Sequence, residues 1–199
     1  RTGRKPIGVR WVDINKGDLK NPKYRSRLVA KELKLDKRDD LFAATPPLEA
    51  KKLLLSLDLT ESFGYDREGH YSPLKIDCID VRRAFFHAKC RRDVYVELPE
   101  EDAEPGMCGK LNMAMYGTRD APQNWEFEYG EFMESIGFVK GKATPCLFHH
   151  VARNIRVVVY GDDFTVLGSD KALDWFRMRI KERYEVEFKA RLGGTDRDD

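Results

Sequence analysis

Residues 155–167 read IRVVVYGDDFTVL and carry the clearest structural signal in the chain. A run of β-branched residues leads into Gly161, Asp162 and Asp163, and a second apolar run follows. This pattern predicts a β-hairpin with two acids at its tip, because the first central position of a type II′ turn needs the positive φ that glycine adopts readily. The apolar arms should lie buried in a sheet and hold the tip against it.

The segments on either side predict strands that alternate with helices. Expected strands cover residues 8–14, 24–30, 74–80, 94–98, 155–160 and 164–167. Expected helices cover residues 48–63, 81–87, 122–136 and 169–184, and the first of them, rich in leucine and followed by Gly64, is expected to be buried. In the third helix, Trp125, Tyr129 and Phe132 are expected in the core rather than as a platform for stacked bases. The order strand, helix, hairpin, helix fits an α+β split sheet of the ferredoxin-like kind.

The composition favours a folded protein inside the cell. The chain has 199 residues, 41% of them hydrophobic, which is enough for a core in one or two compact units. Its 4 cysteines have no zinc-binding spacing, so we expect free thiols in a reducing compartment. No apolar run reaches the roughly 20 residues of a membrane span, so no membrane partner is expected. Because the chain begins with Arg1 and ends without a capped or packed element, we expect a fragment of a longer product.

The charge is distributed unevenly along the chain. The formal net charge is +2, yet residues 1–38 contain 13 Lys or Arg against 4 Asp or Glu, a net of +9. The remainder therefore sums to −7. A basic end of this kind is either a solvated arm or a surface for phosphate groups, and the acidic remainder suits cation binding.

Three acids are candidates for metal-dependent chemistry. Asp80 ends the expected strand 74–80, and Asp162 and Asp163 form the expected hairpin tip. Phosphoryl transfer to a hydroxyl needs carboxylates from separate elements that hold two metal ions, and magnesium accepts oxygen ligands without histidine. An Asp-Asp pair in a turn is often only solvated turn chemistry, so the residues alone leave both interpretations open.

Five segments, in one order between about Val9 and Leu192, carry a wider resemblance. Together they resemble the reverse transcriptase of copia-type (Pseudoviridae-like) LTR retrotransposons. The matching residues are YRSRLVAK at 24–31, DVRRAF at 80–85 with VYVELP at 94–99, Tyr116-Gly117 with Ala121-Pro122 and Trp125, Gly137-Phe138 with PCLF at 145–148, and YGDD at 160–163.

The resemblance implies a set of metal ligands. Asp80 and Asp162 would bridge two metal ions, with Asp163 in support and the backbone of Val81 as a further ligand. The implied ion is Mg²⁺, with Mn²⁺ as an alternative.

The resemblance also implies substrate-binding residues. Arg27 and Lys31 would face the incoming triphosphate. Phe85 stands at the steric gate that excludes a 2′-hydroxyl, although ordinary core packing is an equal alternative. Gly117 would allow close approach of the nucleotide or template, with an ordinary loop glycine as the alternative. Tyr160 would contact the substrate.

The implied architecture is the fingers and palm of a right-hand polymerase, with an antiparallel palm sheet and no thumb. Fingers are expected at 1–65 and 89–120, and palm at 66–88 and 121–199. Implied partners are an RNA or DNA template with its primer, deoxynucleoside triphosphates, and other polyprotein regions: thumb, ribonuclease H and the integrase that serves DNA integration. The implied location is a cytoplasmic virus-like particle, with the nucleus as an alternative.

Three positions depart from the resembled family. Asp120 replaces a common Gln, Glu32 replaces a usual Gly, and Gly161 replaces a more frequent Val or Met. The first two are expected to weaken substrate binding. Gly161-Asp162-Asp163 leaves an RNA-dependent RNA polymerase as an alternative. A catalytically inactive, truncated remnant that only binds nucleic acid is another.

Overall fold

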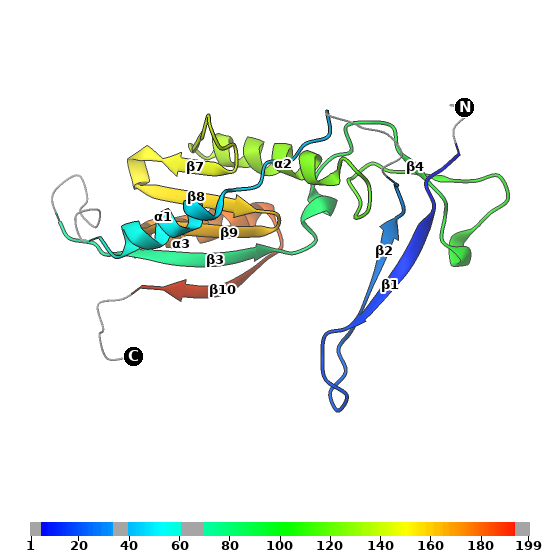
Figure 1. The fold of residues 1–199 in the computed structure, drawn as a ribbon, viewed down its shortest axis with the longest axis horizontal. Helices are drawn as coiled ribbons and strands as arrows, with labels where there is room; N and C mark the ends of the chain where they lie inside the picture. Colours follow the sequence, from blue (N-terminus) through cyan, green and yellow to red (C-terminus); the bar gives the residue numbers. More distant parts are fainter. Residues whose placement is uncertain (1–4, 34–39, 61–69, 194–199) are drawn as a thin grey trace. The chain divides into compact units, whose positions relative to one another are not determined.

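The computed structural model describes residues 5–33, 40–60 and 70–193 (Figure 1). The chain divides into two compact units, the first formed by Arg1–Phe42 and Phe85–Trp125, the second by Ala43–Ala84 and Glu126–Asp199. In chain order the elements are β1 Val9–Asn15, β2 Tyr24–Ala30, α1 Leu48–Asp58, β3 Leu74–Val81, the 3-10 helix η2 Ala84–His87, β4 Tyr95–Val96, η3 Glu100–Asp102, β5 Gly109–Lys110, α2 Ala121–Ser135, β6 Val139–Lys140, β7 Leu147–His150, η4 Val151–Arg153, β8 Ile155–Tyr160, β9 Asp163–Ser169, α3 Asp170–Arg183 and β10 Val186–Leu192.

The second unit is built on a six-stranded antiparallel sheet. Its strand order is β10-β3-β9-β8-β7-β6. The strands β3, β8, β9 and β10 are linked through α2, a tight hairpin and α3, so the chain order is β-α-β-β-α-β. The fold is therefore mixed α and β with antiparallel sheets, as the sequence predicted.

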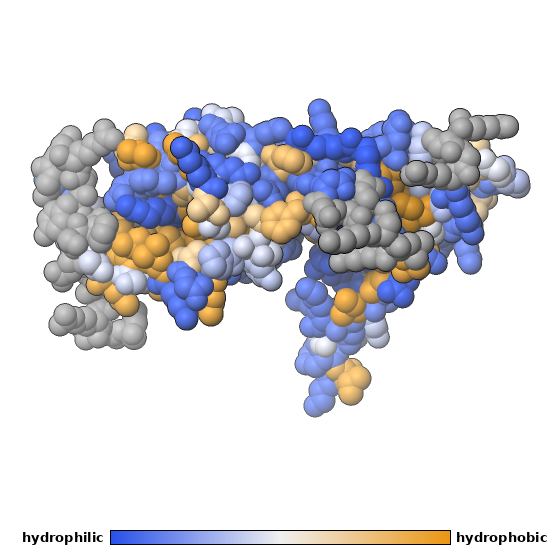
Figure 2. Space-filling view, turned by 45° about the horizontal axis from the view of Figure 1, so that its top comes forward, coloured by the Kyte–Doolittle hydropathy of each residue, from blue (hydrophilic) through white to orange (hydrophobic). Residues whose placement is uncertain are grey.

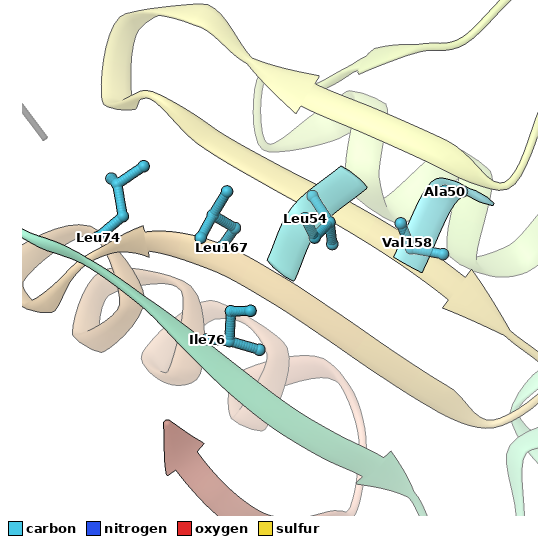
Figure 3. Packing of buried hydrophobic residues seen from close by; sticks show 6 residues of the cluster. All are labelled: Ala50, Leu54, Leu74, Ile76, Val158 and Leu167. Atoms are coloured by element: carbon cyan, nitrogen blue, oxygen red, sulfur yellow. The ribbon is translucent and has the colours of Figure 1, made fainter. Parts of the chain in front are cut away.

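One face of this sheet is covered by α1. Neighbouring residues of a strand point to opposite faces, so Ile76 of β3 lies on the same face as Asp80, four residues further on. Figure 3 shows Ala50 and Leu54 of α1 against side chains from three strands. The buried cluster consists of Ala50, Leu54, Leu74, Ile76, Val158 and Leu167. Burial of each large apolar side chain contributes about 1.5–3 kcal/mol, so this cluster fixes α1 against the strands that carry the acids.

The opposite face is covered by α3, which the sequence predicted at 169–184. Leu173, Phe176 and Ile180 are fully buried at helical spacing, with Ile79 of β3 among the buried residues of the same unit. This stripe confirms the predicted amphipathic helix.

A buried carboxylate joins α3 to the sheet. Asp77 accepts hydrogen bonds from Arg177 Nε at 2.6 Å and Nη2 at 2.8 Å, and from Arg191 Nε at 2.8 Å and Nη2 at 3.0 Å. Burial alone would raise the pKa of Asp77, but the hydrogen bonds and charges of Arg191 and Arg177 hold it below its ordinary value. The two bidentate pairs therefore compensate a charge whose side chain is only 1% exposed.

The first expected helix differs from its prediction. It ends at Asp58 rather than near residue 63, with Leu59 as its C-cap, and the predicted stop at Gly64 lies outside the described residues. Only Ala50 and Leu54 are buried, because α1 contacts the sheet along one stripe. The prediction of a buried helix was therefore wrong for most of its leucines.

Two other predicted elements are shorter in the structure. The helix expected at 81–87 is the single 3-10 turn Ala84–His87, because Val81 still belongs to β3 and Arg83 has a φ of 56°. The strand expected at 94–98 is reduced to Tyr95–Val96, paired with β5. The predicted hairpin at the acids and the helix at 122–136 are confirmed within one or two residues.

The first unit contains a basic hairpin formed by the strands predicted at 8–14 and 24–30. Strands β1 and β2 pair antiparallel from Val9 opposite Ala30 to Asn15 opposite Tyr24. Asn15 Oδ1 closes the connecting turn by accepting from the backbone N–H of Lys23 at 2.8 Å. Figure 2 shows mainly hydrophilic surface on this hairpin, which agrees with its many cations. None of the helices in the described ranges is long and apolar enough to cross a lipid bilayer.

Candidate active site

The tip between β8 and β9 is a two-residue turn. Tyr160 pairs with Asp163, so Gly161 and Asp162 are its central residues. Gly161 has a φ of +62°, whereas Asp162 is not among the residues with positive φ. A positive φ at the first position alone is the mark of a type II′ turn. A Cβ at Gly161 would meet nothing within 4 Å. Glycine is therefore favoured here by the positive φ and not by a lack of room for a side chain.

The three predicted acids lie at the same end of two neighbouring strands. Asp80 of β3 is the direct register partner of Asp163 of β9. The backbone N–H of Val81 donates to the carbonyl of Asp162 at 2.9 Å, which ties the turn to the end of β3. The structure thus brings together residues that are about eighty positions apart in the chain.

The electrostatics of the tip favour a bound cation. Partial burial raises the pKa of Asp163, and the negative charges of Asp162 and Asp80 raise it further. The positive charges of Lys51 and Lys189 act in the opposite direction. Like charges placed this close repel unless a cation lies between them.

The donor chemistry of this site fits a hard divalent cation. Directly opposite residues of an antiparallel pair have Cβ atoms about 4.5–5.5 Å apart, so Asp80 and Asp163 are near enough to share an ion. Mg²⁺ binds through one or two carboxylates and keeps several waters. Among residues 5–33, 40–60 and 70–193, no three side chains of His, Cys, Asp or Glu are grouped tightly enough to hold a metal. Asp80 and Asp163 are direct register partners, and Asp162 lies beside them in the turn.

Lys51, which lies near the tip, was not predicted as a site residue from the sequence. Lys51 of α1 places Nζ 5.2 Å from the centroid of the Tyr160 ring, a cation–π distance. Its charge also acts on Asp163. The only signal in the sequence was a pair of lysines among leucines, and the register of α1 against β8 decides which of them faces the acids.

In the first unit, Tyr116 gathers predicted substrate-binding residues. The Phe85 ring lies 4.6 Å from the Tyr116 ring, centroid to centroid, and Phe86 lies edge-on at 5.5 Å. The guanidinium of Arg27 lies over the same ring at 4.9 Å. Arg27 and Phe85, far apart in the sequence, therefore contact one aromatic side chain, Tyr116, which belongs to one of the five segments that carry the family resemblance.

Gly117 permits a close contact between two backbone segments. Its φ is +90°, and a Cβ there would lie 2.0 Å from the carbonyl oxygen of Ala30. Ala30 donates its N–H to the carbonyl of Tyr116 at 2.8 Å. Within the first unit, the close approach that Gly117 allows is therefore to the end of β2.

A basic cleft adjoins this end of β2. It has a volume of about 1100 Å³, and its charged lining consists of five cations and two acids: Lys5, Arg10, Lys31, Arg92 and Arg119 with Glu32 and Glu97. The backbone N–H of Lys31 donates to Gly8 at 2.8 Å, which fixes the strand end at the cleft. The cations make the cleft suited to phosphate groups.

A sequence model of the reverse transcriptase (RNA-dependent DNA polymerase) family matches residues 1–193. The chain belongs to this reverse transcriptase family. It is 30% identical over 182 residues to the retrovirus-related Pol polyprotein from transposon TNT 1-94 of Nicotiana tabacum, a match that covers 86% of the chain and 13% of that polyprotein. It is 28% identical over 177 residues to the Pol polyprotein from transposon RE1 of Arabidopsis thaliana, with 84% and 11% covered. The putative transposon Ty5-1 protein of Saccharomyces cerevisiae is 25% identical over 115 residues, with 55% and 37% covered.

These relatives identify a copia-type reverse transcriptase domain and confirm the resemblance noted in the sequence. The chain spans roughly an eighth of the length of the plant polyproteins it matches. Reverse transcriptases use divalent metal ions, which agrees with the acids at the tip. The predicted residues of this reverse transcriptase domain divide between the units: Asp80, Tyr160, Asp162 and Asp163 lie in the second, and Arg27, Lys31, Phe85 and Gly117 lie in the first.

Proposed function

We propose that this chain is the RNA- and DNA-templated DNA polymerase part of a retrotransposon polyprotein, and that it extends a primer by two-metal nucleotidyl transfer. The observation that carries the proposal is the placement of Asp80 directly opposite Asp163, with Asp162 in the adjoining turn, in a member of the reverse transcriptase family. Acids from separate elements that meet at one strand end are what such chemistry requires.

The acids would act by holding and orienting Mg²⁺, or Mn²⁺ in its place. Asp80, Asp162 and Asp163 would hold the ions, together with the backbone of Val81. Bound there, the ions would activate the primer 3′-hydroxyl and neutralise the leaving pyrophosphate. The carboxylates need only keep their positions during the reaction, and the hydrogen bond between Val81 and Asp162 contributes to that rigidity.

Cationic and aromatic residues of the first unit would bind the nucleotide. Arg27 and Lys31 supply charge for the triphosphate. Phe85 would exclude ribonucleotides by filling the space of a 2′-hydroxyl. The half-buried state of Phe85 and its contact with Tyr116 favour a ring that presents one face to a ligand over a residue fully packed in a core. Tyr160, which is 50% exposed, would contact substrate at the hairpin tip.

The two units support an assignment to polymerase subdomains. The strand order β10-β3-β9-β8, joined through α2 and α3, is that of a ferredoxin-like sheet and supports the second unit as palm. The basic hairpin and cleft support the first unit as fingers. The motif order gives fingers at 1–65 and 89–120 and palm at 66–88 and 121–199. The two units divide the chain at other positions, after Phe42, Ala84 and Trp125.

The partners and location follow from the polyprotein relatives. A template with its primer and deoxynucleoside triphosphates would be the substrates. Thumb, ribonuclease H and integrase regions would belong to the remainder of the polyprotein, and the integrase would carry out DNA integration. The setting would be a cytoplasmic virus-like particle, or the nucleus.

Primer extension on an RNA template with Mg²⁺ tests the proposal. The wild-type chain should add deoxynucleotides, and Asp162→Asn should reduce the rate by about 10³-fold, because several kcal/mol of charge stabilisation is lost. Asp102→Asn is the matched control, since Asp102 is an exposed acid in the first unit. Equal rates for wild type and Asp162→Asn would refute the assigned role.

A further inference from the structure

Arg92 joins two acids that depart from the resembled family. Its Nη2 donates to Glu32 Oε2 at 2.6 Å and to Asp120 Oδ1 at 2.9 Å. Asn124 Nδ2 donates to the second oxygen of Asp120 at 2.9 Å, and the backbone N–H of Arg119 donates to Glu32 Oε2 at 2.7 Å. One arginine therefore satisfies both carboxylates, with help from two neighbours.

The acids need this arginine because they are removed from water. The side chains of Asp120 and Glu32 are only 4% and 16% exposed. Burial by itself would raise the pKa of Asp120, but the hydrogen bond and charge of Arg92 hold it below its ordinary value. Without Arg92, these two largely buried acids would lose the cation they share, which is costly.

The cluster also joins the two segments that line the basic cleft. Glu32 directly follows Lys31, and its N–H donates to the carbonyl of Gly117 at 3.3 Å. Asp120 lies three residues beyond Gly117 in the same loop. Arg92 thus fixes the end of β2 to the loop at a place where Lys31, Gly117 and Arg119 all line the cleft.

We propose that Arg92 is a positioning residue that makes Glu32 and Asp120 compatible with anion binding in the cleft. It neutralises the two acids, so that Lys31 and Arg119 act on a polyphosphate, and it holds Lys31 in place. The charged lining of the cleft has five cations, Lys5, Arg10, Lys31, Arg92 and Arg119, and two acids, Glu32 and Glu97. Loss of Arg92 lowers this net positive charge by one and leaves Glu32 and Asp120 without the cation they share. This inference rests on the proposed function for the identity of the anion, a nucleoside triphosphate.

The test measures binding of inorganic tripolyphosphate to the whole chain by calorimetry, which needs no catalysis. Arg92→Gln should weaken binding by about five- to tenfold, because a cation is lost and two acids are left unpaired. Arg92→Gln combined with Glu32→Gln and Asp120→Asn should recover to within about twofold of wild type, since the acids are then neutral. Arg179→Gln, an exposed arginine of α3, is the control and should leave binding unchanged.

Two readouts separate positioning from simple stabilisation. In primer extension, Arg92→Gln should raise the KM for deoxynucleotides by the same factor while kcat stays within about twofold. Unchanged tripolyphosphate binding in a folded Arg92→Gln variant, or no recovery in the triple variant, would overturn the inference.

If Arg92→Gln does not fold, the double variant Glu32→Gln with Asp120→Asn, which keeps Arg92, decides the question. Tighter binding of tripolyphosphate by this variant supports the inference, and unchanged or weaker binding overturns it. Absence of primer extension in every variant would count against the proposed function. The calorimetry would still test whether Arg92 supports anion binding.

Discussion

Asp80 on β3 and Asp163 on β9 are direct partners across two antiparallel strands. The apolar cluster under α1 fixes these strands, and the hydrogen bond from Val81 to the carbonyl of Asp162 fixes the turn. The negative charges of Asp162 and Asp80 add to the effect of burial in raising the pKa of Asp163, and the charges of Lys51 and Lys189 offset this only in part. The fold thus positions charges that a cation would stabilise.

Phe85→Ala should relax sugar selection. Removal of the ring should raise ribonucleotide incorporation relative to deoxynucleotide incorporation by about 10- to 100-fold, as expected when a steric exclusion of 1–3 kcal/mol is lost. Competitive primer extension with both nucleotide types measures the ratio. Phe86→Ala is the matched control, because Phe86 contacts the same Tyr116 ring yet is 43% exposed. A loss of stability with an unchanged ratio would assign Phe85 to packing instead.

Asp77→Asn should destabilise the second unit at neutral pH by about 3–5 kcal/mol, because Arg177 and Arg191 lose their shared partner. The folded pKa of Asp77 lies below the ordinary 3.8, so the unfolded chain binds the proton more readily. The contribution of Asp77 is therefore complete above about pH 5 and is lost as the pH falls through the folded pKa. Denaturant unfolding of wild type and variant at pH 7 and pH 3 should show a smaller difference at pH 3. A constant difference would contradict this account.

Two glycines should differ in their tolerance of alanine. Gly161→Ala should cost about 1–2 kcal/mol, because only the positive φ is strained and the space is open. Gly117→Ala should cost more, about 3 kcal/mol or above, since its Cβ would also collide with the backbone of Ala30. Thermal unfolding of both variants measures the order. The reverse order would show that the β2 contact is looser than the structure indicates.

Lys51→Met should tighten Mg²⁺ binding by about two- to fivefold, because it removes a positive charge that competes with the ion near Asp163. Methionine keeps an unbranched chain over the Tyr160 ring. Lys52→Met, the exposed neighbour on α1, should have no such effect. Calorimetric titration with Mg²⁺ provides the comparison, and equal affinity in the two variants would remove Lys51 from the site.

Local patterns predicted much of this fold. The hairpin at Gly161 follows from β-branched arms and one glycine, and α3 follows from the spacing of Leu173, Phe176 and Ile180. The length of α1 was not predictable in the same way. Its leucines suggest burial, yet only tertiary contact determines which of them face the sheet.

Long-range partners were also beyond local reasoning. The pairing of Asp77 with Arg177 and Arg191 joins residues about a hundred positions apart. Glu32 and Asp120 were expected to weaken substrate binding, because nothing in the sequence links them to Arg92. Sequence patterns predict which face of a helix or strand is buried. Ion pairs of this kind depend on how two such elements are placed relative to each other, which local patterns do not show.

Divalent-cation binding to the acids tests the central claim most directly. Calorimetric titration of Mg²⁺ into the wild-type chain should give a binding signal, and Asp80→Asn and Asp163→Asn should each weaken it by at least about tenfold, because each removes a charged oxygen ligand. Asp102→Asn should match wild type. Equal Mg²⁺ affinity in wild type, Asp80→Asn and Asp163→Asn would contradict the claim that these two residues form one metal-binding site.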